Sequence, residues 1–353
     1  MSIELSRTGQ GPAGPPLGLR VLGGAVDVYK RVFVAGAAAH VLSPSKPVRR
    51  SGFELATVVE KLELVAPDVL AVTLRAGDGR ALPSWRPGAH VDVFLPSGRQ
   101  RQYSLCGDPS DRERYRIAVR LIPDGEGGSR EVHEGLWVGD RVRIRGPRNA
   151  FTLVDAPSYL FVAGGIGITP ILPMVRAVGA RGRLVYAGRS RESMPFLDEL
   201  PDAEIRADDE VGAPDVAAII ATAEPGAAVY VCGPPAMIEA AQRCRFALDP
   251  TGSLHTERFS ARPVVDGRGF DLTLARTGRT VRVGAAETAL AAVQRVLSDI
   301  NYSCRQGFCG TCKVAVRAGA VDHRDRLLTP AERADHMLLC VSRAAGDTLV
   351  LDL

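Results

Sequence analysis

The first regular pattern along the chain is a run of short segments rich in β-branched and aromatic residues. Turn residues separate these segments at regular spacing, which is typical of an antiparallel barrel or sandwich. We therefore expect a first β-barrel domain over residues 53–154. Its expected strands cover residues 54–62, 69–75, 90–94, 102–105, 115–121 and 141–145.

The pattern changes after Ser158, where apolar strand-like segments begin to alternate with helical ones. Such alternation predicts a parallel sheet with helical crossovers, and we assign this α/β domain to residues 155–258. The expected strands are 159–163, 183–187, 203–207 and 227–232, and the expected helices are 170–178, 196–200, 214–223 and 235–246.

The last part of the chain has a third pattern, which we assign to a domain of residues 259–353. A linker of about residues 258–269 is followed by strands at 270–275 and 280–284, a helix at 289–299, a cysteine-bearing loop and a strand at 348–351. At the other end, residues 1–52 are rich in Gly, Ala and Pro and then basic. Residues 17–40 could form a helix, and the sequence leaves open whether this extension is partly ordered or docks on a partner or a membrane surface.

Composition narrows the functional classes. The 353 residues are 46% hydrophobic and 24% charged, with a formal net charge of +4 and no run of Lys and Arg. This balance gives no support for nucleic-acid binding. We find neither an apolar run of about 18 residues, which a spanning helix needs, nor a secretory signal. We expect a cytoplasmic protein that associates with membranes, if at all, only through residues 1–52.

The most specific motif is formed by cysteines near the C-terminus. Cys304, Cys309 and Cys312 follow the spacing C-x4-C-x2-C, and Cys340 comes 27 residues later. This is the ligand spacing of plant-type 2Fe–2S ferredoxins. Structural zinc sites usually pair two C-x2-C knuckles, and only one is present here. We therefore assign these four cysteines to a 2Fe–2S cluster in a reducing compartment.

Two glycine-rich turns predict a nucleotide site. An expected strand runs into Gly164, Gly165 and Gly167, and Thr169 is then a plausible N-cap with Pro170 at the first helical position. A helix start binds a pyrophosphate through free N–H groups and its dipole. Another strand ends in Cys232, Gly233 and Pro234, and ligands bind at strand carboxyl ends in such sheets.

A third motif lies in the β-rich domain. In the run from Arg101 through Gln102 and Tyr103 to Ser104, the aromatic ring can stack on a flat ligand, Ser104 can hydrogen-bond its edge, and Arg101 can neutralise a phosphate. Downstream, the turn at Gly127, Gly128 and Ser129 could cradle a phosphate with backbone N–H groups.

Together these motifs resemble the phthalate dioxygenase reductase and vanillate demethylase reductase family over about residues 53–353. Residues 101–109 are similar to the flavin motif of the family, 127–129 to its FMN phosphate loop, and 164–170 and 232–234 to its nicotinamide-nucleotide loops. The resemblance implies a flavin barrel, an NAD domain and a β-grasp ferredoxin domain. It also implies FMN rather than the FAD of related reductases, NADH rather than NADPH, and Phe259 as a cover for the flavin ring.

The expected activity follows from the electron capacities of these groups as well as from the resemblance. A hydride carries two electrons and a cluster accepts one at a time, so a flavin must convert between them. We expect NADH, flavin and cluster to act in that order, with Ser104 near the flavin and Cys232 beside the nicotinamide. The resemblance implies that single electrons pass to a separate terminal oxygenase of the Rieske type, and we expect the protein to be a monomer.

Several points stay open at this stage. The partner could instead be a cytochrome P450 or a di-iron protein, and a redox-sensing module or a zinc-stabilised interaction protein are alternatives of another class. Arg189 and Arg191 could meet a 2′-phosphate, whereas Asp208 and Asp209 would repel one. Arg305 is a candidate for tuning the cluster, and basic residues near it could steer an acidic partner, namely Lys313, Arg324 and Arg326.

Overall fold

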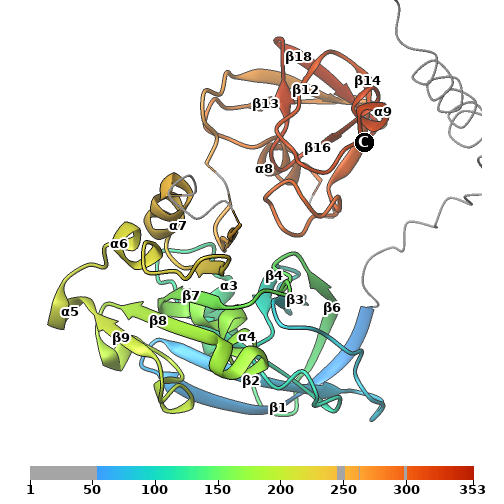
Figure 1. Cartoon of the computed structure of the whole chain (residues 1–353). Coiled ribbons are helices and arrows are strands. Elements are labelled where there is room, and N and C mark those ends of the chain that lie inside the picture. The colour runs from blue at the N-terminus through green and yellow to red at the C-terminus, as the bar shows by residue number, and fades with distance from the viewer. Residues whose placement is uncertain (1–53, 245–250, 262, 298–299) are drawn as a thin grey trace, which may run out of the picture. The chain divides into compact units, whose positions relative to one another are not determined.

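A computed structural model of the protein describes residues 54–244, 251–261, 263–297 and 300–353. The helix expected at residues 17–40 lies outside the described residues. Within them, no helix is long and apolar enough to cross a membrane. The expected combination of an antiparallel barrel, a parallel α/β sheet and a C-terminal ferredoxin-like α+β fold is confirmed (Figure 1).

The first domain is a six-stranded antiparallel sheet in the order β4-β3-β6-β1-β2-β5. Cys106 directly after β4 donates its backbone N–H to Arg116 O of β5 at 2.8 Å, which draws the two outer strands together into a barrel. One helix, α3 (Gly128–Gly135), lies between β5 and β6. The strands are β1 (Glu54–Ala66), β2 (Val69–Ala76), β3 (Ala89–Phe94), β4 (Gln100–Ser104), β5 (Arg114–Arg120) and β6 (Arg141–Asn149).

The second domain is a five-stranded parallel sheet in the order β11-β10-β7-β8-β9. Its helices cover both faces, because one apolar cluster packs α4 against the sheet and another packs α6 and α7 against it. The strands are β7 (Tyr159–Gly164), β8 (Gly182–Gly188), β9 (Glu204–Ala207), β10 (Ala228–Cys232) and β11 (Ser253–Glu257). The helices are α4 (Ile168–Val178), α5 (Asp208–Val211), α6 (Val216–Ile220) and α7 (Pro235–Arg243).

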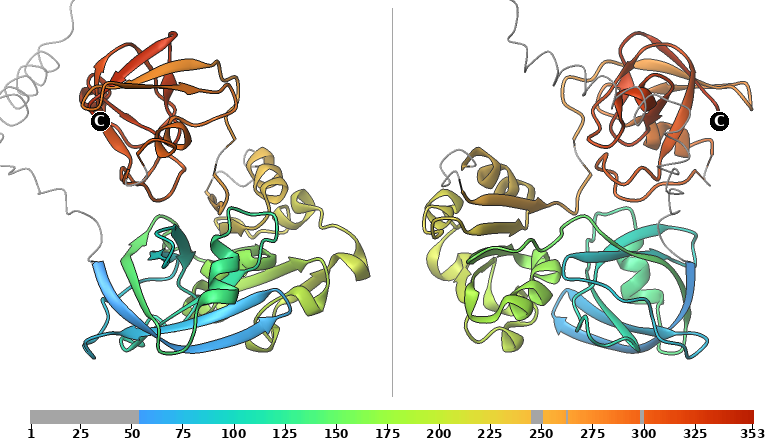
Figure 2. Two further views of the ribbon diagram at one scale, coloured as in Figure 1. Left: turned by 180° about the vertical axis from the view of Figure 1, so that it is seen from behind. Right: turned by 45° about the vertical axis from the view of Figure 1, so that its right-hand side comes forward.

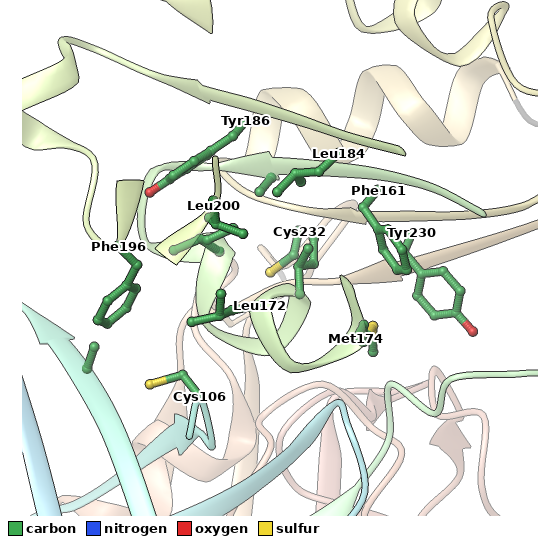
Figure 3. Close-up of a cluster of buried hydrophobic side chains, with 14 of the residues drawn as sticks. Cys106, Phe161, Leu172, Met174, Leu184, Tyr186, Phe196, Leu200, Tyr230 and Cys232 are labelled. Carbon is green, nitrogen blue, oxygen red and sulfur yellow. The ribbon is translucent and has the colours of Figure 1, made fainter. Parts of the chain in front are cut away.

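The barrel and the parallel sheet share one hydrophobic core. Cys106 from the barrel packs in the same buried cluster as Leu172, Phe196 and Cys232 of the second domain (Figure 3). The barrel residues Ala66, Val69, Ala71 and Ala118 belong to this cluster as well. These two domains therefore exclude water from a common interior.

The third domain has a mixed sheet in the order β13-β12-β18-β14-β16, with helix α8 (Ala289–Gln294) packed on it (Figure 2). Its buried cluster contains only residues from Phe270 onward. The strands are β12 (Phe270–Leu274), β13 (Arg279–Val283), β14 (Lys313–Ala318), β16 (His336–Leu338) and β18 (Thr348–Leu351), with a small pair of β15 (Val321–Asp322) and β17 (Arg343–Ala344) beside helix α9 (Pro330–Arg333).

Some predicted elements differ from the observed ones. The segment 196–200 forms a 3₁₀ turn at Leu197–Glu199 rather than an α-helix, and helix α8 ends at Gln294, earlier than expected. Strand β11 was not predicted because its sequence, SLHTE, lacks the apolar alternation of a strand. It is ordered by parallel pairing with the buried strand β10.

Candidate functional site

A cavity beside strand β4 brings together most of the residues predicted to bind the flavin. Sequence separation is large, since β4, the loop before α3 and the segment after β11 all contribute. Seven of these residues line it, namely Arg101, Gln102, Tyr103, Ser104, Gly128, Ser129 and Phe259. Thr169, which was predicted for the nucleotide site, lines this cavity instead.

The polar end of this cavity is built for an anion. Gly127 has the left-handed φ of 82° and directly precedes α3. A Cβ on Gly128 would lie 2.5 Å from Nε of Arg101, so glycine is needed for the guanidinium to lie against the start of the helix. Arg101 also pairs with Glu126 at 3.0 Å. A guanidinium beside free helix N–H groups fits a phosphate well.

The opposite part of the cavity suits a flat ring. Burial raises the pKa of Tyr103, so its phenol stays neutral, and Ser104 is buried at the end of β4. Phe259 is half exposed, as an aromatic side chain covering a removable ligand should be. These three residues fit the predicted stacking, edge and cover positions for an isoalloxazine.

A second cavity gathers the nucleotide residues at the carboxyl ends of the parallel strands. It is lined by Gly164, Gly165, Gly167, Arg189, Asp208, Gly233 and Pro234. The two glycine loops touch, because a Cβ on Gly167 would lie 2.2 Å from the carbonyl oxygen of Cys232 and one on Gly164 would lie 2.6 Å from Cδ of Pro234. The glycines thus let the loops meet where the nucleotide would bind.

The predicted cap of α4 is wrong. Gly167 is the N-cap residue, and no side chain caps the helix. Thr169 lies inside the helix and donates its hydroxyl to the carbonyl of Ile166 at 3.0 Å. A short 3₁₀ turn, Gly165–Gly167, leads directly into α4 and starts the helix two residues earlier than predicted.

The charges around the second cavity favour a free ribose hydroxyl over a 2′-phosphate. Asp208 has a buried carboxylate oxygen without a hydrogen-bond partner. Arg191 is already paired with Glu210 at 2.7 Å. The side chain of Arg189 is 76% exposed and lies 3.8 Å from Asp68. A carboxylate oxygen without a partner accepts a hydrogen bond from a ribose hydroxyl and repels a phosphate.

The two cavities adjoin. Phe259, Ile166 and Arg120 line both of them. Arg120 was not predicted; its guanidinium donates to Ser193 O at 2.6 Å and would lie 3.2 Å from a Cβ on Gly165. Arg120 is the last residue of β5, and this position at the carboxyl end of a strand is the feature of the sequence from which it could have been predicted. The shared lining lets a flavin ring and a nicotinamide meet.

Cys232, which was predicted to lie beside the nicotinamide, is not among the residues that line the two cavities. It is fully buried in the shared core (Figure 3). Its strand neighbour is Glu257 of β11. The Glu257 residue is only partly buried as a whole, yet its Oε2 is sealed from solvent and has no partner. Burial raises the pKa of Glu257 to about 8, and sequence reasoning missed this carboxyl group.

The four predicted cluster cysteines converge. The thiols of Cys309 and Cys340 hydrogen-bond to the sulfur of Cys304 and lower its pKa, and Cys340 does the same for Cys312. Within the described ranges no three His, Cys, Asp or Glu side chains surround one ion position. Four thiolates shared between two irons need only two per metal.

The surrounding backbone fits a 2Fe–2S cluster. Gly307 and Gly310 have φ of 81° and 75°, which keep the loop tight around the thiols. The backbone N–H of Gln306 donates to the Cys304 sulfur at 3.3 Å. The donor set and these glycines are those that such a cluster requires.

Most of the basic residues near the cluster that were expected to steer an acidic partner already pair with acidic residues of this chain. Lys313 pairs with Glu332 at 3.2 Å and Arg324 with Asp322 at 2.7 Å. Arg326 is exposed and makes no ion pair among the described residues. Arg305 is not a solvated surface charge, because it lies over the Tyr302 ring and 3.4 Å from Glu126.

Comparisons with known proteins agree with this arrangement. A family model described as a 2Fe–2S iron–sulfur cluster binding domain matches residues 272–345. The phenoxybenzoate dioxygenase subunit beta of Ectopseudomonas oleovorans is 43% identical over 82% of this chain and 94% of its own length.

Two solved structures extend the likeness to the fold. Phthalate dioxygenase reductase, described as a modular structure for electron transfer from pyridine nucleotides to 2Fe–2S, is 36% identical with a TM-score of 0.66, covering 85% of this chain and 98% of its own. A type IV self-sufficient cytochrome P450 monooxygenase is 40% identical with a TM-score of 0.66, covering 89% of this chain and 44% of its own length. The chain therefore belongs to the family of oxygenase-system reductases that includes phthalate dioxygenase reductase.

Proposed function

We propose that this reductase passes electrons from NADH through FMN to its 2Fe–2S cluster and on to a separate oxygenase. The observation that carries the proposal is the junction of the two cavities at Phe259, Ile166 and Arg120, with cluster-loop residues hydrogen-bonded to the flavin strand β4. In the proposed division, residues 53–154 hold the flavin, 155–258 the nucleotide and 259–353 the cluster.

The chain's own residues hold and orient the reactants. Arg101, with the N–H groups after Gly127, binds the flavin phosphate, while Tyr103 and Ser104 fix the ring. The loops at residues 164–167 and 233–234 hold the pyrophosphate. A bound flavin accepts a hydride and releases its electrons singly, and the 2Fe–2S cluster carries one electron at a time.

The choice of NADH over NADPH is supported by Asp208. Its unpaired, buried carboxylate oxygen lies at the end of β9 in the nucleotide cavity, where it would bind a ribose hydroxyl. We expect Asp208→Asn to narrow the preference for NADH over NADPH by about tenfold, because one charged hydrogen bond contributes about 1.5–3 kcal/mol. Steady-state kcat/KM with both coenzymes measures it.

FMN rather than FAD is supported by the compact polar end of the flavin cavity, where Arg101 and the start of α3 close around one phosphate site. An anaerobic titration with NADH tests the whole path. Flavin and cluster absorbance should both bleach, and the released flavin should be FMN. A protein that keeps both bands oxidised under excess NADH would refute the reductase assignment.

The oxygenase partner is proposed to be of the Rieske dioxygenase or demethylase class. This is supported by the match to the phenoxybenzoate dioxygenase subunit, which extends over 94% of that protein's length. A cytochrome P450 partner is the second candidate, since the self-sufficient P450 monooxygenase is 40% identical. Reduction rates with purified representatives of both classes decide between them.

Two further properties are proposed with the function. All seven cysteines, Cys106 to Cys340, are free of disulfides, which supports a reducing, cytoplasmic location. We also propose that the protein works as a monomer. Light scattering after size-exclusion chromatography tests the monomer, and a dimer at micromolar concentration would contradict it.

A further inference from the structure

A buried carboxylate sits where the barrel meets the cluster loop. Asp92 of β3 is completely inaccessible to solvent. Two arginines of β6 bind it: Arg145 Nε lies 3.2 Å from Oδ2, and Arg148 contacts the same oxygen. Neither the flavin nor the nucleotide cavity includes these three side chains, and no role in cofactor binding accounts for them.

The partner of this ionic group is the residue that precedes the first cluster ligand. Ser303 is buried, and its hydroxyl donates to Asp92 Oδ1 at 2.8 Å. Ser303 Oγ also accepts hydrogen bonds from Arg148 Nη2 at 2.6 Å and from Gln102 Nε2 at 3.1 Å. The hydroxyl thus uses its donor and both acceptor positions on barrel residues.

The neighbouring residue is held as well. The carbonyl of Tyr302 accepts from Gln100 Nε2 at 2.7 Å and from Arg145 Nη2 at 3.4 Å. Successive side chains of a strand point to opposite sides. In β4, Gln100 and Gln102 hydrogen-bond to the cluster loop, Arg101 and Tyr103 line the flavin cavity, and Gln102 lines that cavity as well. One short strand therefore contacts the flavin site and the cluster loop together.

The group depends on Asp92 for its charge balance. Without this carboxylate, Arg145 and Arg148 would remain as two largely buried, mutually repelling guanidinium groups, with 15% and 11% of their side chains exposed, which is strongly destabilising. His90 nearby adds no charge near neutral pH, because burial and Arg148 lower its pKa to about 4. Buried ionic groups of this kind fix geometry more than they add affinity.

We propose that Asp92 is a positioning residue, which, with Arg145 and Arg148, forms a socket that seats residues 302–304 against the flavin strand. The socket fixes how far the cluster lies from the flavin. The proposal rests on the proposed function only in that electrons pass between these two groups in this chain, and the seating itself is testable without turnover.

The test uses the full-length holoprotein with Asp92→Asn, which keeps the shape of the side chain but removes its charge. Hydrogen exchange of the peptide spanning residues 300–308 should accelerate at least about tenfold, while peptides of strand β7 stay unchanged. In anaerobic stopped-flow mixing, flavin reduction by NADH should stay within about twofold of wild type. Transfer from flavin to cluster should slow at least about tenfold, because the rate of electron transfer falls steeply as the two groups move apart.

Two further variants keep the test decisive. Gln100→Ala removes the hydrogen bond to Tyr302 O and the one that Gln100 Oε1 accepts from Arg145 Nη2 at 3.2 Å, without altering charge. It should give the same pattern in weaker form if Asp92→Asn fails to fold. Thr57→Val is the matched control, because Thr57 is equally buried and its hydroxyl bonds to Val142 O at 2.7 Å within the barrel. It should change neither measurement.

The results distinguish a failure of the Asp92 socket from a failure of the proposed electron-transfer function. If folded Asp92→Asn and Gln100→Ala both keep wild-type exchange in residues 300–308 and wild-type transfer rates, the socket does not position the loop. If wild-type protein shows no reduction of the cluster by NADH, the proposed function fails, whereas the exchange measurement still reports on the socket.

Discussion

Gly167 offers a direct test of how the nucleotide site is built. An alanine Cβ at this position would lie 2.2 Å from the carbonyl oxygen of Cys232 and 2.9 Å from the N–H nitrogen of Gly233. Both neighbours are backbone atoms, so they cannot rotate away as a flexible side chain would. Ordinary contact begins at 3.4 Å, and the two loops would have to separate by about 1 Å, an overpacking that costs about 1–3 kcal/mol.

The functional effect of Gly167→Ala should fall on the nucleotide alone. The Kd for NADH, taken from the concentration dependence of flavin reduction in stopped-flow mixing, should rise about 10- to 100-fold, since groups displaced by about 1 Å lose such factors. The flavin and cluster content should stay at wild-type level. Gly346→Ala is the matched control, because a Cβ there meets no atom within 4 Å. An unchanged Kd and unfolding temperature in Gly167→Ala would show that this close approach of the loops is not required.

The remaining predictions concern the flavin, the third domain and one buried acid. Gly128→Ala should weaken FMN binding about 10- to 100-fold, the equivalent of one charged hydrogen bond, because the new Cβ displaces Arg101. The fluorescence of flavin released on dilution measures FMN binding, and the NADH site should be unaffected. Arg343→Met should lower the stability of the ferredoxin domain by about 3 kcal/mol, because the buried guanidinium donates to three backbone carbonyls. Chemical denaturation followed by the cluster absorbance measures this loss, and an unchanged denaturation midpoint would contradict it. The pKa of Glu257 is raised from 4.5 to about 8, so the protonated form is favoured in the folded protein and wild type should lose stability as pH rises from about 4.5 to 8. Glu257→Gln should remove this decrease of the unfolding temperature between pH 5 and 9. If the unfolding temperatures of the two proteins change with pH in parallel, Glu257 does not have a raised pKa.

Motifs with fixed local spacing were readable from the sequence. The cysteine motif and the glycine turns work over a few residues, so their geometry follows from local backbone preferences, and the residues at 101–104 and 164–167 do line two cavities. The start of α4 was misplaced because Thr169 has the chemistry of a cap, while the preceding 3₁₀ turn moves the helix start to Ile168.

Contacts made across the sequence could not be predicted in this way. Asp92 and Ser303 are 211 residues apart. In its own segment, each of them looks like an ordinary polar residue on the surface. Glu257 likewise appears as one acid in a polar strand. Its burial results from pairing with β10, a tertiary effect that overrides the local pattern.

The common interior of the first two domains limits how the chain can be divided. A cut near residue 155 would open a cluster that contains Cys106 and Phe196 from opposite sides of that point. A cut in the segment 260–269 would instead leave the interior of the ferredoxin domain whole, because its buried cluster begins at Phe270. The chain thus divides into two parts with separate interiors, a reductase body and an electron carrier, and the carrier can be transplanted without redesigning a core.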